Sequence, residues 1–237
     1  MAGILFIISA PSGSGKSTLV AEVRRLVEGL DFSISYTTRK LRGSEMEGRE
    51  YHFTNVETFL GMVERGEFLE WAEVFGNYYG TAWNALQHAK TEGKDLLLDI
   101  DVQGAIQVIN RVPHAVSIFI VPPSPQVLER RLRNRSQAEG VTDEAVIQRR
   151  LAQAKQELLT LDKYKYVLIN DVLDEAVTEL QAIVQFERGE AAEAAAAVAQ
   201  QCRTTVHSPR LQAVLKSFGV SAVLCGWLAV CILHFAR

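Results

Sequence analysis

Residues 4–18 read ILFIISAPSGSGKST, an apolar run that ends in a glycine-rich turn followed by lysine, serine and threonine. The aliphatic run is typical of a parallel strand buried on both faces, and a helix is predicted to begin at Lys16. In such a strand–turn–helix unit, backbone N–H groups surround a phosphate chain and the helix N-terminus adds positive potential. The stretch therefore predicts an α/β fold with a nucleotide site after its first strand.

The turn itself is predicted to be a phosphate-binding loop. Gly13 and Gly15 permit the backbone angles that a close approach to phosphate requires. Lys16 is expected to reach the β- and γ-phosphates, and the hydroxyl of Ser17 is expected to bind Mg²⁺. The predicted ATP-binding residues of this loop are Ala10, Pro11, Ser12, Gly13, Ser14, Gly15, Lys16, Ser17 and Thr18.

Strand-length apolar runs alternate with helix-length stretches along the chain, which predicts a mostly parallel sheet flanked by helices. The predicted strands are Ile4–Ser9, Leu96–Ile100, Val116–Val121 and Tyr166–Ile169. The predicted helices are Lys16–Glu28, Ala82–Thr91, Val102–Asn110, Pro125–Arg135, Asp143–Thr160 and Asp174–Arg188. The stretch Ser33–Gly80 breaks the alternation with short apolar pieces and many charges, so it is interpreted as an inserted lobe.

A second acidic signal follows the predicted strand Leu96–Ile100 in the sequence LLLDIDVQG. An acid at the end of a neighbouring strand can orient Mg²⁺ or its waters, so Asp99 joins Ser17 as a predicted metal ligand. Asp101–Gly104 also fits the DxxG pattern of GTPase switches. A GTPase should carry a later Asn-Lys-x-Asp for the guanine base, and the chain contains none.

The inserted lobe carries residues suited to a nucleoside monophosphate. Arg39 and Arg42 present fork-shaped donors for a phosphate, and Tyr51 offers a phenolic hydroxyl. The carboxylate of Glu70 suits the N1–H and N2–H donors of guanine, and hydroxyls of Ser35 or Thr81 could donate to its O6. Adenine lacks that donor pair, so a buried Glu70 would disfavour AMP.

Several motifs in a fixed order resemble the bacterial guanylate kinases over about residues 3–188. They are SAPSGSGKST, SYTTRKLR, EGREYHF, FLEWAEVFGNYYGT, LLLDIDVQGA, IFIVPPS, RRLRNR and VLIND. The family commonly has Ala at the position of Ala10. The chain departs from the family pattern at Leu41, at Gly43-Ser44 and at Ser136.

The resemblance implies a P-loop kinase that moves the terminal phosphoryl group of ATP to GMP with Mg²⁺, in purine nucleotide metabolism. It implies a core (1–34, 82–123 and 161–188), a mixed GMP-binding lobe (35–81) and a helical lid (124–160). Phosphate contacts of GMP are implied for Arg39, Arg42, Tyr51 and Tyr79. Guanine contacts are implied for Ser35, Glu70, Thr81 and Asp101. Catalytic roles are implied for Lys16, Arg131, Arg135 and Arg150, and Asn170 is implied to lie by the adenine of ATP.

Two other functions stay open at this point. One is a kinase for another nucleoside monophosphate such as AMP or UMP, against which Glu70 argues. The other is a non-catalytic guanylate-kinase-like interaction module, against which the intact Lys16 and Ser17 argue. The cluster Arg130–Arg135 could also be only a solvated helix face. The formal net charge of −3 argues against a nucleic-acid partner.

The composition changes after Arg188. Residues 189–216 are rich in Ala and polar residues and are predicted to be a linker, and 217–237 form a hydrophobic tail. Ser217–Ala236 contains no Asp, Glu, Lys or Arg, so the tail is a candidate membrane span. Arg203, Arg210 and Lys216 precede it, which would keep the kinase on the cytoplasmic face.

The alternatives for the tail are a helix docked on the domain or on a partner chain, and an extension without function. The three cysteines all lie in this C-terminal part, so the kinase domain is expected to be cytoplasmic. The sequence does not distinguish a monomer from a homo-oligomer.

Overall fold

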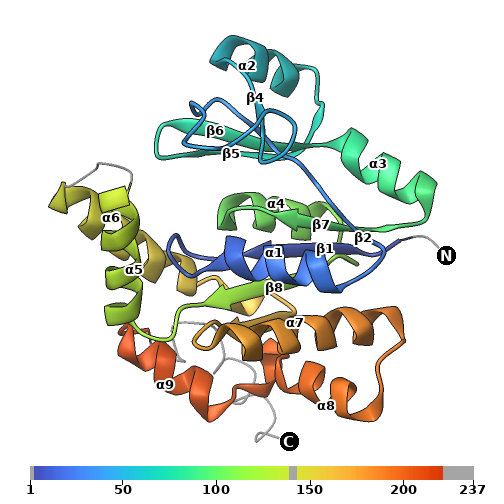
Figure 1. Ribbon diagram of the computed structural model, residues 1–237, viewed down its shortest axis with the longest axis vertical. Coiled ribbons are helices and arrows are strands. Elements are labelled where there is room, and N and C mark those ends of the chain that lie inside the picture. Colours follow the sequence, from blue (N-terminus) through green and yellow to red (C-terminus); the bar gives the residue numbers. More distant parts are fainter. Residues whose placement is uncertain (1–2, 139–142, 221–237) are drawn as a thin grey trace, which may run out of the picture. The chain divides into compact units, whose positions relative to one another are not determined.

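The computed structural model describes residues 3–138 and 143–220 of the chain, drawn in Figure 1. These residues form two compact units. The first unit comprises residues 3–8 and 26–116, and the second comprises residues 9–25, 117–138 and 143–220.

The first unit contains three parallel strands in the order β2-β7-β1. Their bounds are β1 Leu5–Ser9, β2 Leu30–Phe32 and β7 Asp95–Asp99. Leu5 pairs with Leu96 and Ile8 with Asp99. All residues of β1 are buried, which is the reason why its sequence is continuously aliphatic and not alternating. Helices α3 (Trp83–Glu92) and α4 (Val102–Arg111) precede and follow β7.

The inserted lobe, also in the first unit, is a four-stranded mixed sheet in the order β4-β3-β6-β5. Its elements are β3 Tyr36–Thr37, β4 His52–Phe53, α2 Val56–Glu64, β5 Phe68–Val74 and β6 Asn77–Ala82. β3 runs parallel to β4 and antiparallel to β6, and β5 and β6 form an antiparallel hairpin. Phe59 of α2 packs on Phe68 of β5 with ring centroids 4.5 Å apart. The predicted mixed lobe is thereby confirmed.

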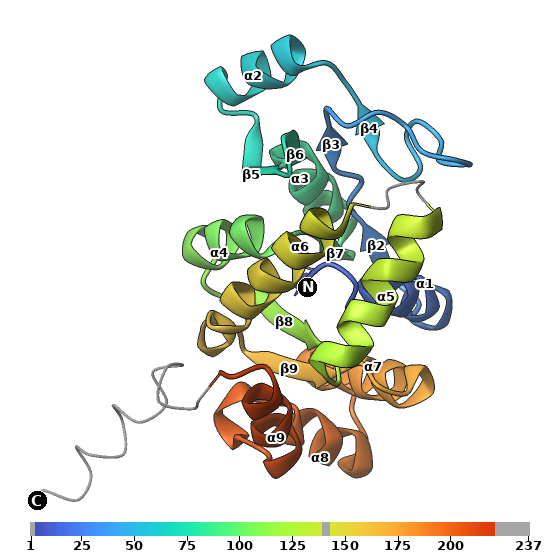
Figure 2. The same ribbon diagram turned by 90° about the vertical axis from the view of Figure 1, so that its left-hand side faces the viewer.

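The second unit contains a parallel strand pair, β8 Val116–Val121 and β9 Tyr166–Ile169, with helices around it. The helices are α1 Lys16–Leu26, α5 Pro125–Ala138, α6 Glu144–Leu158 and α7 Leu173–Arg188, with a 3₁₀ turn at Leu161–Lys163. Figure 2 shows α5 and α6 side by side. Arg133 joins them, because its guanidinium bonds Glu129 at 2.7 Å and Glu144 at 2.6 Å.

The segment expected to be a linker is folded. Helices α8 (Glu193–Gln201) and α9 (Pro209–Ser217) lie on either side of a 3₁₀ turn at Thr204–Val206. Alanine has the highest helix propensity, which favours α8. Ser208 caps α9 by accepting a hydrogen bond from Leu211 N at 3.2 Å, and Pro209 stands at its first position. The chain between these helices bonds β9, because Val167 N donates to Cys202 O at 2.8 Å.

The candidate membrane span falls mainly outside the described residues, which end at 220. Within the described part of the chain, no helix has both the length and the apolar character that a bilayer crossing needs. Its beginning, Ser217, is the last residue of α9.

Candidate functional site

The phosphate loop belongs to the second unit. Ser14 N donates to Pro11 O at 3.1 Å and closes the turn, and α1 begins at Lys16. Gly13 and Gly15 have φ angles of +88° and +84°, a region that residues with a side chain rarely adopt. Ser17 and Thr18, in the first turn of α1, are exposed. The loop has two features of an anion-binding site, a glycine-rich backbone turn and the N-terminus of a helix.

Two residues from distant parts of the chain brace this loop. Asn170 Nδ2 donates to Ser14 O at 2.8 Å, and Arg131 Nη1 donates to the same oxygen at 3.3 Å. Arg131 also donates to Asn170 O through Nη1 and Nη2, both at 3.2 Å. Asn170 is only 4% exposed, and a Cβ added to Gly15 would lie 2.4 Å from Asn170 Nδ2. The resemblance implies that Asn170 lies by the adenine of ATP. In the structure its side-chain amide bonds the backbone of the loop.

The lid arginines differ in their surroundings. Burial lowers the pKa of Arg131, although the nearby Asp171 carboxylate opposes that shift. Arg135 lies exposed on α5, and Arg150 is half-buried on α6. The two helices therefore bring all three of the predicted cations into one unit with the phosphate loop.

The residues predicted to contact guanine lie in the first unit. Ser35 Oγ and Thr81 Oγ1 form a hydrogen bond of 3.3 Å. Glu70 on β5 pairs with Thr81 on β6, and all three residues are buried. The structure therefore brings together two hydroxyls and one carboxylate in the lobe. Glu70 is 2% exposed, and its carboxylate lies against Gly104 of α4.

Asp101, the fourth predicted guanine contact, caps α4. Its Oδ1 accepts hydrogen bonds from Gln103 N at 2.7 Å and Gly104 N at 3.2 Å. A carboxylate at this position satisfies helix N–H groups and interacts favourably with the helix dipole. The cap thus fixes the first turn of α4, which is the turn that Glu70 contacts.

The residues predicted to contact the GMP phosphate surround one buried guanidinium, that of Arg39. Arg39 is 8% exposed and pairs with both oxygens of Glu45, at 2.9 and 2.8 Å. The Tyr51 ring lies 5.2 Å from the guanidinium carbon and 5.9 Å from the Tyr79 ring. Arg42, on the exposed side of the loop, donates its backbone N–H to Glu45 at 2.8 Å.

Glu45 was not among the predicted site residues. Burial acts to raise the pKa of its carboxyl, but hydrogen bonds from Arg39 and Arg42 hold that pKa below its usual range. The signal in the sequence was an acid close after two arginines in a stretch otherwise suited to phosphate. Glu45 keeps the guanidinium of Arg39 fixed and compensated in a buried position, where an unpaired charge would be costly.

Tyr51 is held neutral in this cluster. Burial and the nearby Asp99 carboxylate raise the pKa of its phenol to about 12. The hydroxyl therefore remains a hydrogen-bond donor over the physiological pH range. Asp99 itself is the last residue of β7.

The predicted metal ligands lie one in each unit, with Asp99 in the first and Ser17 in the second. Among residues 3–138 and 143–220, no group of three or more His, Cys, Asp or Glu residues could hold a metal ion. Hydroxyl and carboxylate oxygens are hard donors of the kind that Mg²⁺ takes together with waters and substrate phosphates. Each of the two predicted ligands thus has an oxygen of the kind that suits Mg²⁺.

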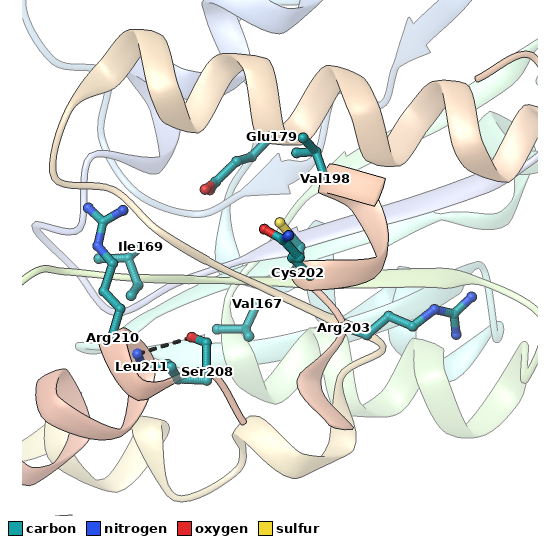
Figure 3. A pocket seen from close by; sticks show the side chains of 10 residues that line it. Val167, Ile169, Glu179, Val198, Cys202, Arg203, Ser208, Arg210 and Leu211 are labelled. Atoms are coloured by element: carbon teal, nitrogen blue, oxygen red, sulfur yellow. Dashed lines mark hydrogen bonds between the residues drawn. The ribbon is translucent and has the colours of Figure 1, made fainter. Parts of the chain in front are cut away.

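A hollow of about 250 Å³ lies among β9, α7, α8 and α9 (Figure 3). Arg210 on its rim forms ion pairs of 3.6 Å with Asp171 and Glu175. Burial raises the pKa of Glu179 and, to about 12, the pKa of the Cys202 thiol. None of the residues assigned to ATP, GMP or Mg²⁺ lines this hollow.

Comparison with known proteins agrees with these features. Residues 3–187 match the family model described as guanylate kinase. The chain is 50% identical over 226 residues to the guanylate kinase of Koribacter versatilis, which covers 92% of this chain and 97% of that protein. It is 47% identical over 188 residues to the guanylate kinase of Vibrio vulnificus, covering 78% of this chain and 89% of that one.

The two alignments differ at the C-terminal extension. The Koribacter alignment covers 92% of the chain, which is more than the segment 3–187 that matches the family model. It therefore continues into the C-terminal extension. A crystal structure of guanylate kinase from Anaplasma phagocytophilum is also similar, with a TM-score of 0.64 and 33% identity. That likeness covers 82% of this chain and 89% of the other. The matched residues include the phosphate loop, the mixed lobe and the α5–α6 pair, and the chain belongs to the guanylate kinase family.

Proposed function

We propose that this protein is an ATP:GMP phosphotransferase in which the lobe of the first unit binds GMP and the phosphate loop of the second unit binds ATP. The products are GDP and ADP. The observation that carries the assignment of the acceptor is the buried set of Ser35, Glu70 and Thr81. Membership of the family supports the reaction itself.

The buried set is chemically suited to guanine. The carboxylate of Glu70 accepts two hydrogen bonds from N1–H and N2–H, while a hydroxyl of Ser35 or Thr81 donates to O6. AMP would present an acceptor at N1, which cannot donate a hydrogen bond to the carboxylate. A site that hydrogen-bonds a substrate donor rejects an analogue lacking it by roughly 10⁴–10⁵. Asp101 lies at the first turn of α4 beside Glu70, which supports a guanine contact from that side.

The phosphate of GMP is proposed to bind Arg39, Arg42, Tyr51 and Tyr79. Arg39 is already fixed by Glu45 and the Tyr51 ring, so little side-chain entropy is lost when a phosphate binds. The neutral phenol of Tyr51 can donate a hydrogen bond to a phosphate oxygen without repulsion.

The ATP phosphates are proposed to lie on the backbone of residues 10–18, with Lys16 on the β- and γ-phosphates. Ser17 and Asp99 would hold Mg²⁺, which when bound neutralises charge on the phosphate oxygens. Arg131, Arg135 and Arg150 are proposed to offset the negative charge of the migrating phosphoryl group, and Asn170 to position the loop and the adenine side of ATP. Phosphoryl transfer of this kind relies on positioning and electrostatics and needs no dedicated general base.

The cellular setting follows from the substrates. We propose that the catalytic residues act in the cytoplasm, in purine nucleotide metabolism and the recycling of GMP. Anchoring through residues 217–237 stays a separate hypothesis, which sedimentation of the full-length chain with membranes would test.

A substrate panel tests the assignment. ADP release is measured with ATP and each of GMP, AMP, UMP and CMP, for the wild type and for Glu70→Gln. Only GMP should support rapid turnover, and Glu70→Gln should raise KM for GMP while KM for ATP stays within about twofold. Equal turnover with AMP, or no turnover with any acceptor, would overturn the proposal.

A further inference from the structure

Side chains of helix α4 form hydrogen bonds with the backbone at one edge of the lobe sheet. β5 is the last strand in the sheet order, so within residues 3–138 and 143–220 no strand pairs with the other side of its backbone. At this edge, the side chain of Gln107 of α4 bonds both the backbone N–H and the backbone carbonyl of Trp71. Its Nε2 donates to Trp71 O at 2.7 Å, and its Oε1 accepts from Trp71 N at 3.4 Å.

The same face of α4 makes two further bonds to this strand. Arg111 Nη1 donates to Leu69 O, and Gln103 Nε2 donates to Glu73 O at a longer 3.5 Å. Gln103, Gln107 and Arg111 are spaced four residues apart and so lie on one face of the helix. Their backbone partners are spaced two residues apart, which places all of them along one edge of the strand.

Glu70 lies between two of these bonded positions, Leu69 and Trp71. The register of the β5–β6 hairpin shifts between Phe68 and Glu70. A bulge of this kind leaves a residue unpaired and re-aims the side chains next to it. The residue left out of the register is Leu69, whereas Glu70 pairs with Thr81. The bonds from Gln107 and Arg111 hold the two neighbours of Glu70 from the other side of the strand.

The carboxylate of Glu70 also touches α4 directly. A Cβ added to Gly104 would lie 2.2 Å from Glu70 Oε2 and 2.9 Å from its Cδ. Only glycine leaves room for the carboxylate at this point. The N-terminal turn of α4, capped by Asp101, is also where a helix dipole favours negative charge.

We propose that α4 is the element that sets the position of the Glu70 carboxylate, with Gln107 as a positioning residue and Gly104 as the residue that makes room for it. This inference rests on the proposed role of Glu70 in guanine recognition. Two hydrogen bonds to N1–H and N2–H require the carboxylate to be placed within a few tenths of an ångström. Displacing it should weaken GMP and reduce the preference for GMP over IMP, which lacks the 2-amino group.

The first test replaces Gln107 by Met, which keeps the length of the side chain and removes both hydrogen bonds. KM for GMP should rise about 5- to 20-fold, with KM for ATP within about twofold and the GMP-over-IMP preference reduced. The matched control is Gln103→Met, on the same face of α4 but bonded only to Glu73 at 3.5 Å. That variant should change KM for GMP by less than about twofold.

A double-mutant comparison separates positioning from a general loss of structure. If Gln107 acts through Glu70, Gln107→Met should raise KM for GMP much less in a Glu70→Gln background than in the wild type. An equal rise in both backgrounds would overturn the inference. The inference would also be overturned if the folded Gln107→Met variant had a normal KM for GMP while the single variant Glu70→Gln had a raised one. No effect of Glu70→Gln itself would instead overturn the proposed guanine contact.

Gly104→Ala provides a second test, in which a purely structural role and the proposed positioning role predict different results. Alanine favours a helix interior over glycine by about 1 kcal/mol, so a merely structural role predicts an equal or higher melting temperature and normal GMP binding. The clash with Glu70 predicts a rise in KM for GMP of about tenfold or more. The control is Gly61→Ala in α2, where the added Cβ would meet only the end of the Arg65 side chain at 3.1 Å. Normal KM for GMP in Gly104→Ala would overturn the role given to Gly104.

Discussion

The lobe of the first unit and the phosphate loop of the second unit differ in the groups that we propose to bind ligands. In the lobe they are side chains, such as the Glu70 carboxylate and the Arg39 guanidinium, and other side chains fix them. In the loop they are mainly backbone N–H groups, and side chains serve as braces from behind. Asn170 and Arg131 both hold the carbonyl of Ser14.

The difference suits the ligand proposed for each region. A triphosphate presents similar oxygens along its length, so a curved backbone with a helix N-terminus binds it without reading a base. A nucleobase is distinguished by the pattern of its donors and acceptors, which only placed side chains can match. Substitutions in the loop should therefore affect ATP and turnover, whereas substitutions in the lobe should affect GMP.

The largest effect is expected for Lys16→Ala, which removes the charged side chain that we propose to bind the ATP phosphates. Loss of its charge on the β- and γ-phosphates should lower kcat by about 10³-fold or more, with an unchanged melting temperature, because Lys16 is not part of the core. Steady-state kinetics and thermal unfolding measure the two quantities. Lys90→Ala, an exposed lysine on α3, is the control. Near-normal turnover of Lys16→Ala would contradict the assigned loop.

Gly15→Ala should have the next largest effect, because it displaces a brace of the loop backbone. The added Cβ would lie 2.4 Å from Asn170 Nδ2 at a φ of +84°, so the Asn170–Ser14 bond cannot persist. We expect kcat/KM for ATP to fall by about 10²-fold and KM for GMP to change little. Gly66→Ala is the matched control, since its φ is +66° but the added Cβ meets nothing within 4 Å. Equal losses for both substrates would contradict the contrast between the two regions.

The smallest effect concerns the pH dependence of the lobe. Below pH 10 the Tyr51 phenol is protonated in the folded and unfolded chains alike. Between about pH 10 and 12 the unfolded chain releases this proton while the folded chain keeps it, because its pKa is raised to about 12. The free energy of unfolding should therefore fall with pH over this range.

Urea unfolding at pH 9.5, 10.5 and 11.5 measures that slope for the wild type and for Tyr51→Phe. The variant should lose less stability across the range, since it has no phenol to titrate at this position. Cys202, whose pKa burial also raises to about 12, titrates in both proteins and cancels in the difference. Identical slopes would contradict a raised pKa for the half-buried Tyr51.

Some elements followed from local sequence almost to the residue. β8 and β9 have the predicted bounds Val116–Val121 and Tyr166–Ile169, because each is a short aliphatic run with polar or turn residues at its ends. The predicted helix starts at Lys16, Val102 and Pro125 agree with α1, α4 and α5. The helices of residues 193–217 did not follow, since their apolar positions are sparse and a polar, proline-containing stretch separates them.

The sequence by itself determined the α/β class, the phosphate loop and the residue types of the lobe, since each depends on neighbours along the chain. Only the tertiary structure decided what holds them. Asn170 reaches Ser14 across a separation of 156 residues, and Gln107 reaches Trp71 across 36. Local patterns carry no trace of such pairs, because an asparagine or glutamine has the same propensities whether it faces water or a distant carbonyl. Packing alone brings that carbonyl within reach, and the cost of burying it unbonded keeps the pair together.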